Sequence, residues 1–200
     1  KAEKQVGRAP HGAPALILGA YTFEHVCRLE PELAPDPHFA SFAGPRNRHG
    51  SGPFCKFKIG RQLAGISGVY AIVVDNHLAY LGETKDIADR FNREYGTISE
   101  RKLHPDGQST NCKINSEIWK ARNGGANIEL FAYSTPNHYE VEQELFNALG
   151  LPPWNSPKGR MQCPPQPFAA GKLVTVSDSL SPQASAKEAD VYEALGLPYI

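Results

Sequence analysis

The sequence lacks a long hydrophobic segment, an excess of charge of one sign, and any C-x-x-C pair of cysteines. No apolar run among its 200 residues approaches the roughly 18 that a membrane-spanning helix needs, so we expect no membrane span. The 21 basic and 21 acidic side chains cancel, which excludes binding to nucleic acid through overall basicity. The apolar share of 40% is enough to form a core, so wholesale disorder is excluded as well.

The few cysteines lie far apart in the chain. They are Cys27, Cys55, Cys112 and Cys163. No histidine is spaced to complete a metal site with them, so we expect reduced thiols in a cytoplasmic protein. A structural zinc site assembled from distant residues is the alternative.

Acidic residues are absent from one stretch, between residues 37 and 74. The same stretch contains five basic residues, namely Arg46, Arg48, Lys56, Lys58 and Arg61. Such a run can be a merely solvated face. It can also face phosphates, because each Lys or Arg that meets a phosphate releases condensed counterions. We favour the second interpretation.

Hydrophobic periodicity predicts an α/β fold of the α+β type. The predicted elements are a strand over 21–29, a long loop over 31–53, strands over 69–74 and 78–81, a helix over 85–94 capped by Thr84, a helix capped by Asn111, a strand over 128–132 and a helix over 138–149. The order β-β-α-α-β-α implies a small mixed sheet of three strands, flanked by helices.

Composition divides the chain into three parts. Residues 1–62 are predicted to be an N-terminal extension with a strand and a basic loop, and residues 63–157 the main domain. Residues 158–200 are predicted to be a Pro-rich linker and a C-terminal tail, with a short helix over 188–195.

Two tyrosines, Tyr70 and Tyr80, lie on the predicted hairpin strands. Side chains alternate between the faces of a strand, so the loop length decides whether the two share a face. A two-residue loop at 75–76 would place them on opposite faces. A three-residue loop at 75–77 pairs Val74 with Leu78 and brings both hydroxyls to one face, and we predict this loop.

A carboxylate, Glu142, lies on the apolar face of its predicted helix, in line with Leu145, Phe146 and Leu149. A carboxylate on a buried face needs a partner or a cation. Mg²⁺ suits the position because this hard cation is often held by one or two carboxylates.

Together these residues suit phosphodiester hydrolysis, whose transition state carries extra negative charge. Arg90, which borders the buried stripe of its helix, and a metal ion at Glu142 could stabilise that charge. Tyr70 could take a proton from the attacking water if nearby cations lower its pKa, with Tyr80 orienting the water or the phosphate.

Five elements in this order resemble the GIY-YIG nuclease superfamily, over about residues 63–155. They are Gly68-Val69-Tyr70, Tyr80-Leu81-Gly82, Arg90, Glu142 and Pro152-Pro153-Trp154-Asn155. The resemblance implies a small sheet domain that cuts nucleic acid with one divalent metal ion, Mg²⁺ or Mn²⁺. It also implies that Tyr70 is the general base, Arg90 contacts the phosphate, Glu142 holds the metal and Asn155 braces the site. The stretches 52–57, 90–92, 95–96 and 108–115 are similar to an uncharacterised bacterial or archaeal subgroup.

The sequence departs from the family pattern at three points. Leu81 stands where Ile is usual. Many members place His or Tyr four residues after the Arg, where this chain has Glu94, and we assign the role to Tyr95. The spacing from Glu142 to Asn155 is one residue longer than in members of the family. A one-residue slip would offer Gln143, which cannot be an anionic ligand.

The resemblance predicts a DNA endonuclease of restriction, defence or repair, with RNA left open as a substrate. The predicted DNA contacts are Arg46, Arg48, Lys56, Lys58, Arg61, Lys85, Arg93, Asn111 and Lys113. Cutting both strands with one site per chain would favour a homodimer. The alternatives are a non-catalytic nucleic-acid-binding module on the same scaffold and a base-excising enzyme that needs no metal.

Overall fold

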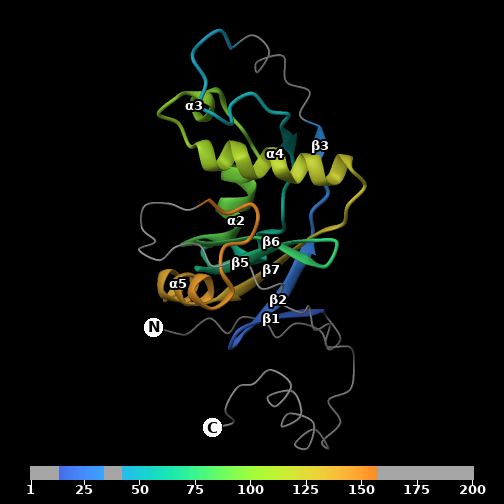
Figure 1. Cartoon of the computed structure of the whole chain (residues 1–200), viewed down its shortest axis with the longest axis vertical. Coiled ribbons are helices and arrows are strands. Elements are labelled where there is room, and N and C mark those ends of the chain that lie inside the picture. The colour runs from blue at the N-terminus through green and yellow to red at the C-terminus, as the bar shows by residue number, and fades with distance from the viewer. Residues whose placement is uncertain (1–13, 34–41, 157–200) are drawn as a thin grey trace, which may run out of the picture.

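The computed structural model describes residues 14–33 and 42–156 (Figure 1). The predicted linker and tail at 158–200, with the helix over 188–195, lie outside the described residues. So does Cys163. Among the residues described, no helix is long and apolar enough to cross a bilayer.

The main sheet has five strands in the order β1-β2-β7-β5-β6, and every neighbouring pair is antiparallel. The strands are β1 (Ala15–Leu18), β2 (Tyr21–Arg28), β7 (Ile128–Ser134), β5 (Gly68–Val74) and β6 (His77–Thr84). The prediction of a mixed three-stranded sheet is therefore wrong in both respects. The strand predicted over 21–29 is β2, which pairs with β7, about a hundred residues later in the sequence. Strand β1 pairs with the other edge of β2.

Helices cover both faces of this sheet (Figure 1). One face packs against α2, η2 and α4, and α5 covers the other. Strand β5 lies in the centre, and all but its last residue are buried. This explains its unbroken apolar run, because a strand covered on both faces does not alternate.

Helix α5 (His138–Leu149) has the predicted bounds. It ends at Gly150, whose φ of 77° is a left-handed conformation that glycine adopts without strain. Strand β7 also confirms its prediction, and extends two residues beyond it.

The helix predicted over 85–94 differs in its start and in its form. A short helix, α2 (Ile87–Asp89), is capped by Asp86, whose side chain accepts a hydrogen bond from the backbone of Asp89 at 2.8 Å. It continues as a π-helix, η2 (Arg90–Tyr95). The predicted cap, Thr84, instead ends β6 and accepts a hydrogen bond from the backbone N–H of Asp86.

The remaining elements lie before and between these. Helix α4 (Ser109–Asn123) begins two residues before the predicted cap, Asn111, which is buried in its first turn. The elements that the sequence did not predict are β1, α3 (Glu100–Leu103), the 3₁₀ turn η1 (Arg61–Leu63) and a second sheet formed by β3 (Glu32–Leu33) and β4 (Cys55–Lys56). Part of the predicted 31–53 loop is thus a strand.

The described cysteines, Cys27, Cys55 and Cys112, are free thiols. Burial raises the pKa of Cys27 to about 11 and that of Cys55 to about 12. These thiols are therefore poor nucleophiles at neutral pH.

A fully buried amide, Asn115 of α4, joins three elements. Its side chain accepts a hydrogen bond from Cys55 N at 2.8 Å and donates to Cys55 O at 2.8 Å and to Tyr95 O at 2.6 Å. The amide therefore ties α4 to β4 and to the end of η2.

Replacing this amide should destabilise the fold. Asn115→Ala leaves buried backbone groups without partners, and we expect a loss of about 1 to 3 kcal/mol in the free energy of unfolding, measured by urea denaturation. Asn123→Ala, an exposed site at the end of the same helix, should change it by less than about 0.5 kcal/mol. Equal effects of the two changes would contradict the joining role.

Candidate active site

The β5–β6 hairpin turns through two residues rather than the predicted three. Val74 pairs with His77, and the turn residues Asp75 and Asn76 have φ values of 45° and 66°. Two consecutive residues with positive φ are typical of the tight hairpin turn that matches the twist of the strands, and Asp and Asn tolerate this conformation. The predicted pairing of Val74 with Leu78 is wrong.

A β-bulge compensates for the shorter turn. Val73 pairs with Leu78, but Ile72 pairs with Tyr80, so Ala79 is an extra residue in β6. The extra residue reverses the alternation of faces beyond it. Tyr70 and Tyr80 consequently lie on the same face of the sheet, as predicted, although for a different reason.

The π-helix brings a third tyrosine to the same place. Tyr95 lies five residues after Arg90, and the wider turn of a π-helix places residues i and i+5 next to each other. The Arg90 Cζ atom lies 5.7 Å from the centre of the Tyr95 ring. The assignment of Tyr95 to the position after the arginine agrees with this geometry.

The three phenol groups meet at their hydroxyls. Tyr95 Oη lies 2.8 Å from Tyr70 Oη and 3.3 Å from Tyr80 Oη. The neighbouring Gly82 leaves the room they need, because a Cβ there would lie 2.5 Å from Tyr70 Oη. We name these three residues the tyrosine cluster.

Burial controls the charge of the tyrosine cluster. It raises the pKa of Tyr70, Tyr80 and Tyr95 well above the usual tyrosine value. The positive charge of Arg90 acts in the opposite direction on all three, but burial outweighs it. The net pKa of Tyr70 is therefore raised, although Arg90 lies nearby. Proton transfer to Tyr70 was predicted to need a lowered pKa.

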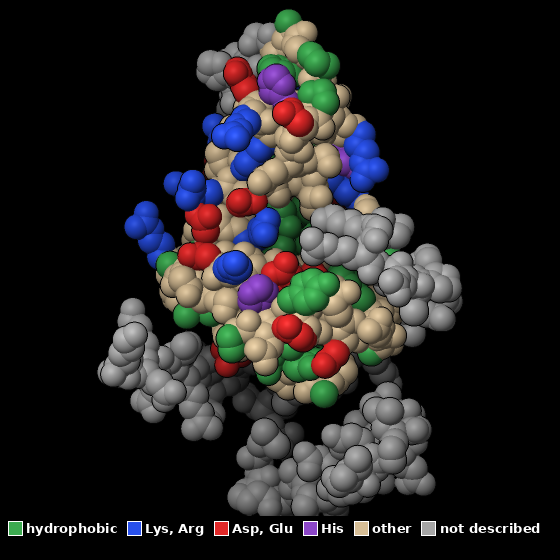
Figure 2. All heavy atoms as spheres, turned by 90° about the vertical axis from the view of Figure 1, so that its left-hand side faces the viewer, with side chains coloured by type: hydrophobic (Ala, Val, Ile, Leu, Met, Phe, Trp, Pro, Cys, Tyr) green, Lys and Arg blue, Asp and Glu red, His purple; other side chains and the backbone are tan. Residues whose placement is uncertain are grey.

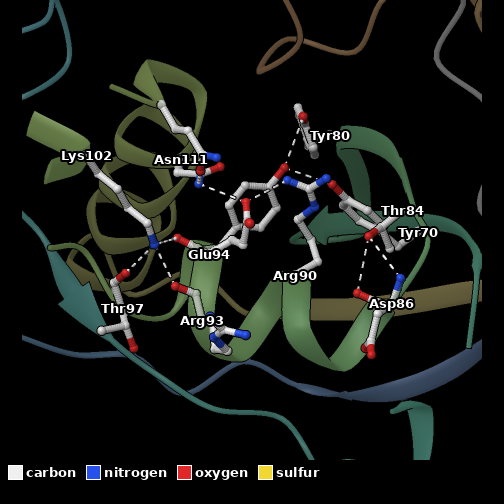
Figure 3. Close-up of polar contacts among 12 residues, drawn as sticks. Tyr70, Tyr80, Thr84, Asp86, Arg90, Arg93, Glu94, Thr97, Lys102 and Asn111 are labelled. Carbon is white, nitrogen blue, oxygen red and sulfur yellow. Dashed lines mark hydrogen bonds and ion pairs between the residues drawn. The ribbon is translucent and has the colours of Figure 1, made fainter. Parts of the chain in front are cut away.

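Arg90 is held by a clamp that the sequence analysis did not identify. Its Nη1 donates to Glu94 Oε2 at 2.9 Å, and Asn111 Nδ2 donates to the same oxygen at 3.0 Å (Figure 3). Asn111 also bonds to Gln108. One side of the guanidinium is thus fixed, and its buried Nε–H has no acceptor among the described residues.

Lys102 stabilises the end of η2, which is also visible in Figure 3. Its Nζ donates to the backbone oxygens of Arg93, Glu94 and Thr97 at 2.6, 3.0 and 2.8 Å. A cation at the carboxyl end of a helix is favourable because the terminal carbonyl groups point towards it. The i, i+4 spacing of Arg90 and Glu94 could have revealed that ion pair, but no local pattern reveals Lys102.

Asn155 bonds to the outer edge of β6. Its side chain accepts from Leu81 N at 3.0 Å and donates to Leu81 O at 2.7 Å. Trp154 N adds a hydrogen bond to Ala79 O at 2.9 Å. The segment therefore fixes β6 on both sides of Tyr80, consistent with the bracing role that the resemblance implies.

All the predicted catalytic residues line one cleft, of about 580 Å³. They are Tyr70, Tyr80, Arg90, Tyr95, Glu142 and Asn155. A second carboxylate, Glu83, also lines it, and lies 2.7 Å from the Nδ1 atom of His138.

The cleft offers few ligands for a metal ion. The described residues contain no group of three or more His, Cys, Asp or Glu side chains that could hold one. Glu142 is half-buried on α5 and faces the cleft. A single carboxylate of this kind fits Mg²⁺, which usually keeps several waters and substrate phosphates as its other ligands.

The predicted DNA contacts divide into two groups. Arg48, Asn111 and Lys113 line the cleft. The residues that do not line it are Arg46, Lys56, Lys58, Arg61, Lys85 and Arg93. Of these, Arg46 donates to the backbone oxygens of Phe42 and Gly50, and Arg93 forms an ion pair with Asp89. Figure 2 shows Lys and Arg side chains gathered in the upper part of one face, above a hollow in the surface.

Comparison with known proteins shows a sequence similarity to a phage protein. No protein-family model matches the chain. Over 100 residues it is 28% identical to Endonuclease II of Enterobacteria phage T4, covering 44% of this chain and 70% of that protein. The chain is similar to a phage endonuclease. A structure of a bacteriophage T4 EndoII mutant superposes loosely, with a TM-score of 0.40 and 23% identity, covering 67% of this chain and 92% of that one.

The tyrosine cluster should be visible in an alkaline titration. We expect Tyr70, Tyr80 and Tyr95 to stay neutral at a pH near 10, where exposed tyrosines ionise. Tyrosinate absorbance measures this: Tyr70→Phe should leave the absorbance that develops near pH 10 unchanged, because the buried Tyr70 does not contribute to it.

The same shift has a consequence for stability. Above about pH 10 the unfolded chain loses phenolic protons that the folded protein still holds, so stability should fall as the pH rises. Ionisation of Tyr70 together with the exposed tyrosines would contradict the burial argument.

Proposed function

We propose that this protein is an endonuclease that hydrolyses phosphodiester bonds of DNA with one divalent metal ion. The observation that carries the proposal is the meeting of two phenols, a clamped guanidinium and a carboxylate in one cleft. The motifs that resemble the GIY-YIG superfamily contribute all four groups, and the sequence match to a phage endonuclease supports the same activity.

Arg90 would bind the phosphate. During hydrolysis water attacks phosphorus, the bond to one ester oxygen breaks, and the non-bridging oxygens gain negative charge. The Glu94 clamp fixes the guanidinium, so little reorganisation is needed when that charge develops. Arg90 itself lines the cleft, so its guanidinium is placed where a phosphate would bind.

Glu142 would hold the metal ion, with water and the substrate phosphate as the other ligands. A bound Mg²⁺ or Mn²⁺ supplies positive charge and lowers the pKa of a bound water. The carboxylate lies on a helix whose apolar side chains pack against the sheet, so its position is set by the core.

The tyrosine cluster would orient the attacking water and take part in the transfer of its proton. Tyr70 Oη is hydrogen-bonded to Tyr95 Oη, and a neutral phenol can both accept and donate a hydrogen bond. Tyr70 could accept the proton of the attacking water only after losing its own proton to solvent, as a phenolate, which added positive charge would have to stabilise against burial. This predicts that cleavage increases towards alkaline pH.

A role in restriction, defence or DNA repair, a cytoplasmic location and a homodimer for double-strand cutting remain part of this proposal. RNA remains open as a substrate, and a non-catalytic nucleic-acid-binding module is the alternative function. Cleavage assays distinguish the endonuclease from the binding module, and DNA from RNA as the substrate.

The metal ion and Glu142 can be tested together on supercoiled plasmid. We expect nicking in Mg²⁺ or Mn²⁺ and none in EDTA. Glu142→Gln should slow nicking by roughly 10²- to 10³-fold, because the amide cannot act as an anionic ligand. Glu140→Gln, exposed on the same helix, is the matched control and should leave the rate unchanged. Binding without cleavage would favour the binding module, and nicking in EDTA would refute the metal role.

The clamp on Arg90 can be tested by a pair of substitutions. Glu94→Ala frees the guanidinium and should lower kcat roughly tenfold, with a smaller effect on KM. Glu94→Gln keeps an oxygen that accepts from Nη1 and should retain most of the activity.

A double-mutant cycle shows whether Glu94 acts through Arg90. In an Arg90→Ala background, Glu94→Ala should cause little further loss. Equal inactivation by Glu94→Gln and Glu94→Ala would instead make the carboxylate a proton carrier.

A further inference from the structure

A second group of basic side chains lines the cleft apart from Arg90. Arg48 and His49 come from the loop before β4, and Lys113 from α4. The charges that act on His49 are Arg48, Lys113, Glu117 and Lys120. Arg90 is instead bonded to Glu94 and lies beside the ring of Tyr95. The cleft therefore contains two distinct cationic neighbourhoods.

The turn that carries Arg48 and His49 is fixed to the protein by Asn47, which is only 8% exposed. Its Nδ2 donates to Lys102 O at 2.6 Å and His104 O at 3.2 Å, and its Oδ1 accepts from His49 N at 2.9 Å. These bonds order the turn before any ligand arrives, so binding there costs little conformational entropy.

Lys113 belongs to α4, a different element from the turn that carries Arg48 and His49. Its Nζ donates to Ser156 Oγ at 2.8 Å, which holds the ammonium group at the cleft. Burial lowers the pKa of Lys113, and the positive charge of Arg48 lowers it further, whereas Glu117 raises it. Two nearby cations that destabilise each other favour an anion between them.

His49 is affected in the same way. Burial lowers its pKa, as do Arg48, Lys113 and Lys120, and the carboxylate of Glu117 opposes them. The imidazole is therefore neutral at physiological pH in the absence of a ligand. An anion bound beside it would raise the pKa and stabilise the protonated form.

We propose that Arg48, His49 and Lys113 form a second phosphate subsite, which binds a phosphate of the DNA strand flanking the scissile one. The inference rests on the proposed function and specifies how the same cleft holds its substrate. The cleft volume of about 580 Å³ has room for more than the group that reacts at Arg90. A strand held at two phosphates is fixed in register, and such contacts position a substrate without reading its sequence.

The test uses DNA in which single phosphates are replaced by uncharged methylphosphonates. Binding is measured in EDTA, so that the result does not depend on cleavage. Short DNA duplexes would each carry one methylphosphonate, at successive positions along one strand. We expect one position flanking the scissile phosphate to weaken binding by wild-type protein roughly tenfold. Arg48→Ala should bind unmodified DNA more weakly and lose most of the sensitivity at that position, because one of the contacts to that phosphate is already absent.

The control is Arg101→Ala, an exposed residue of α3 outside the cleft lining. It should keep the wild-type pattern of sensitivity. Lys113→Ala should reduce the slope of log affinity against log salt by about 1. If every methylphosphonate weakens wild type and Arg48→Ala equally, the subsite does not exist.

The pH dependence of binding tests His49 separately. DNA affinity should increase from about pH 8 to about pH 6, because the bound phosphate stabilises protonated His49. His49→Gln should remove this increase, and an unchanged pH dependence in that variant would exclude His49 from the subsite.

The outcomes also separate this inference from the proposed function. If the methylphosphonate pattern is as predicted but no nicking occurs with the metal ion, the subsite proposal stands and the endonuclease proposal fails. If the protein nicks DNA but is equally sensitive to every methylphosphonate, the endonuclease proposal stands and the subsite proposal fails.

Discussion

The site depends on three buried hydroxyl groups that must meet at one point. Tyr95 Oη contacts both Tyr70 Oη and Tyr80 Oη, and a buried polar group without such a partner would be costly. Each hydroxyl comes from a different element, β5, β6 or η2. The packing of these elements is therefore constrained by the same contacts that line the cleft.

Two local irregularities of the fold bring these hydroxyls together, and neither can be found from hydrophobic periodicity, for the same reason. The bulge at Ala79 and the π-turn of η2 each add one residue to a regular element. An added residue shifts every later side chain, yet leaves the composition of the segment unchanged. The shared face of Tyr70 and Tyr80 was predicted correctly, while the loop that should have produced it was not.

Where one element alone decides the outcome, the sequence was a sufficient guide. The bounds of α5 and the position of Glu142 on it follow from spacing within a single helix. The number of strands in the sheet does not, because β2 finds its partner about a hundred residues away. The same holds for Asn47 and Asn115, whose side chains bond to backbone groups of distant segments. Such residues look like ordinary polar surface until the tertiary structure is known.

The bond between Asn155 and Leu81 has a consequence for assembly. β6 is the last strand of the sheet, and an outermost strand normally presents unpaired backbone groups to which a foreign strand can add. Here an amide side chain occupies both backbone groups of Leu81, and Trp154 occupies the oxygen of Ala79. Two copies of this protein therefore cannot continue their sheets into one another at Ala79 and Leu81.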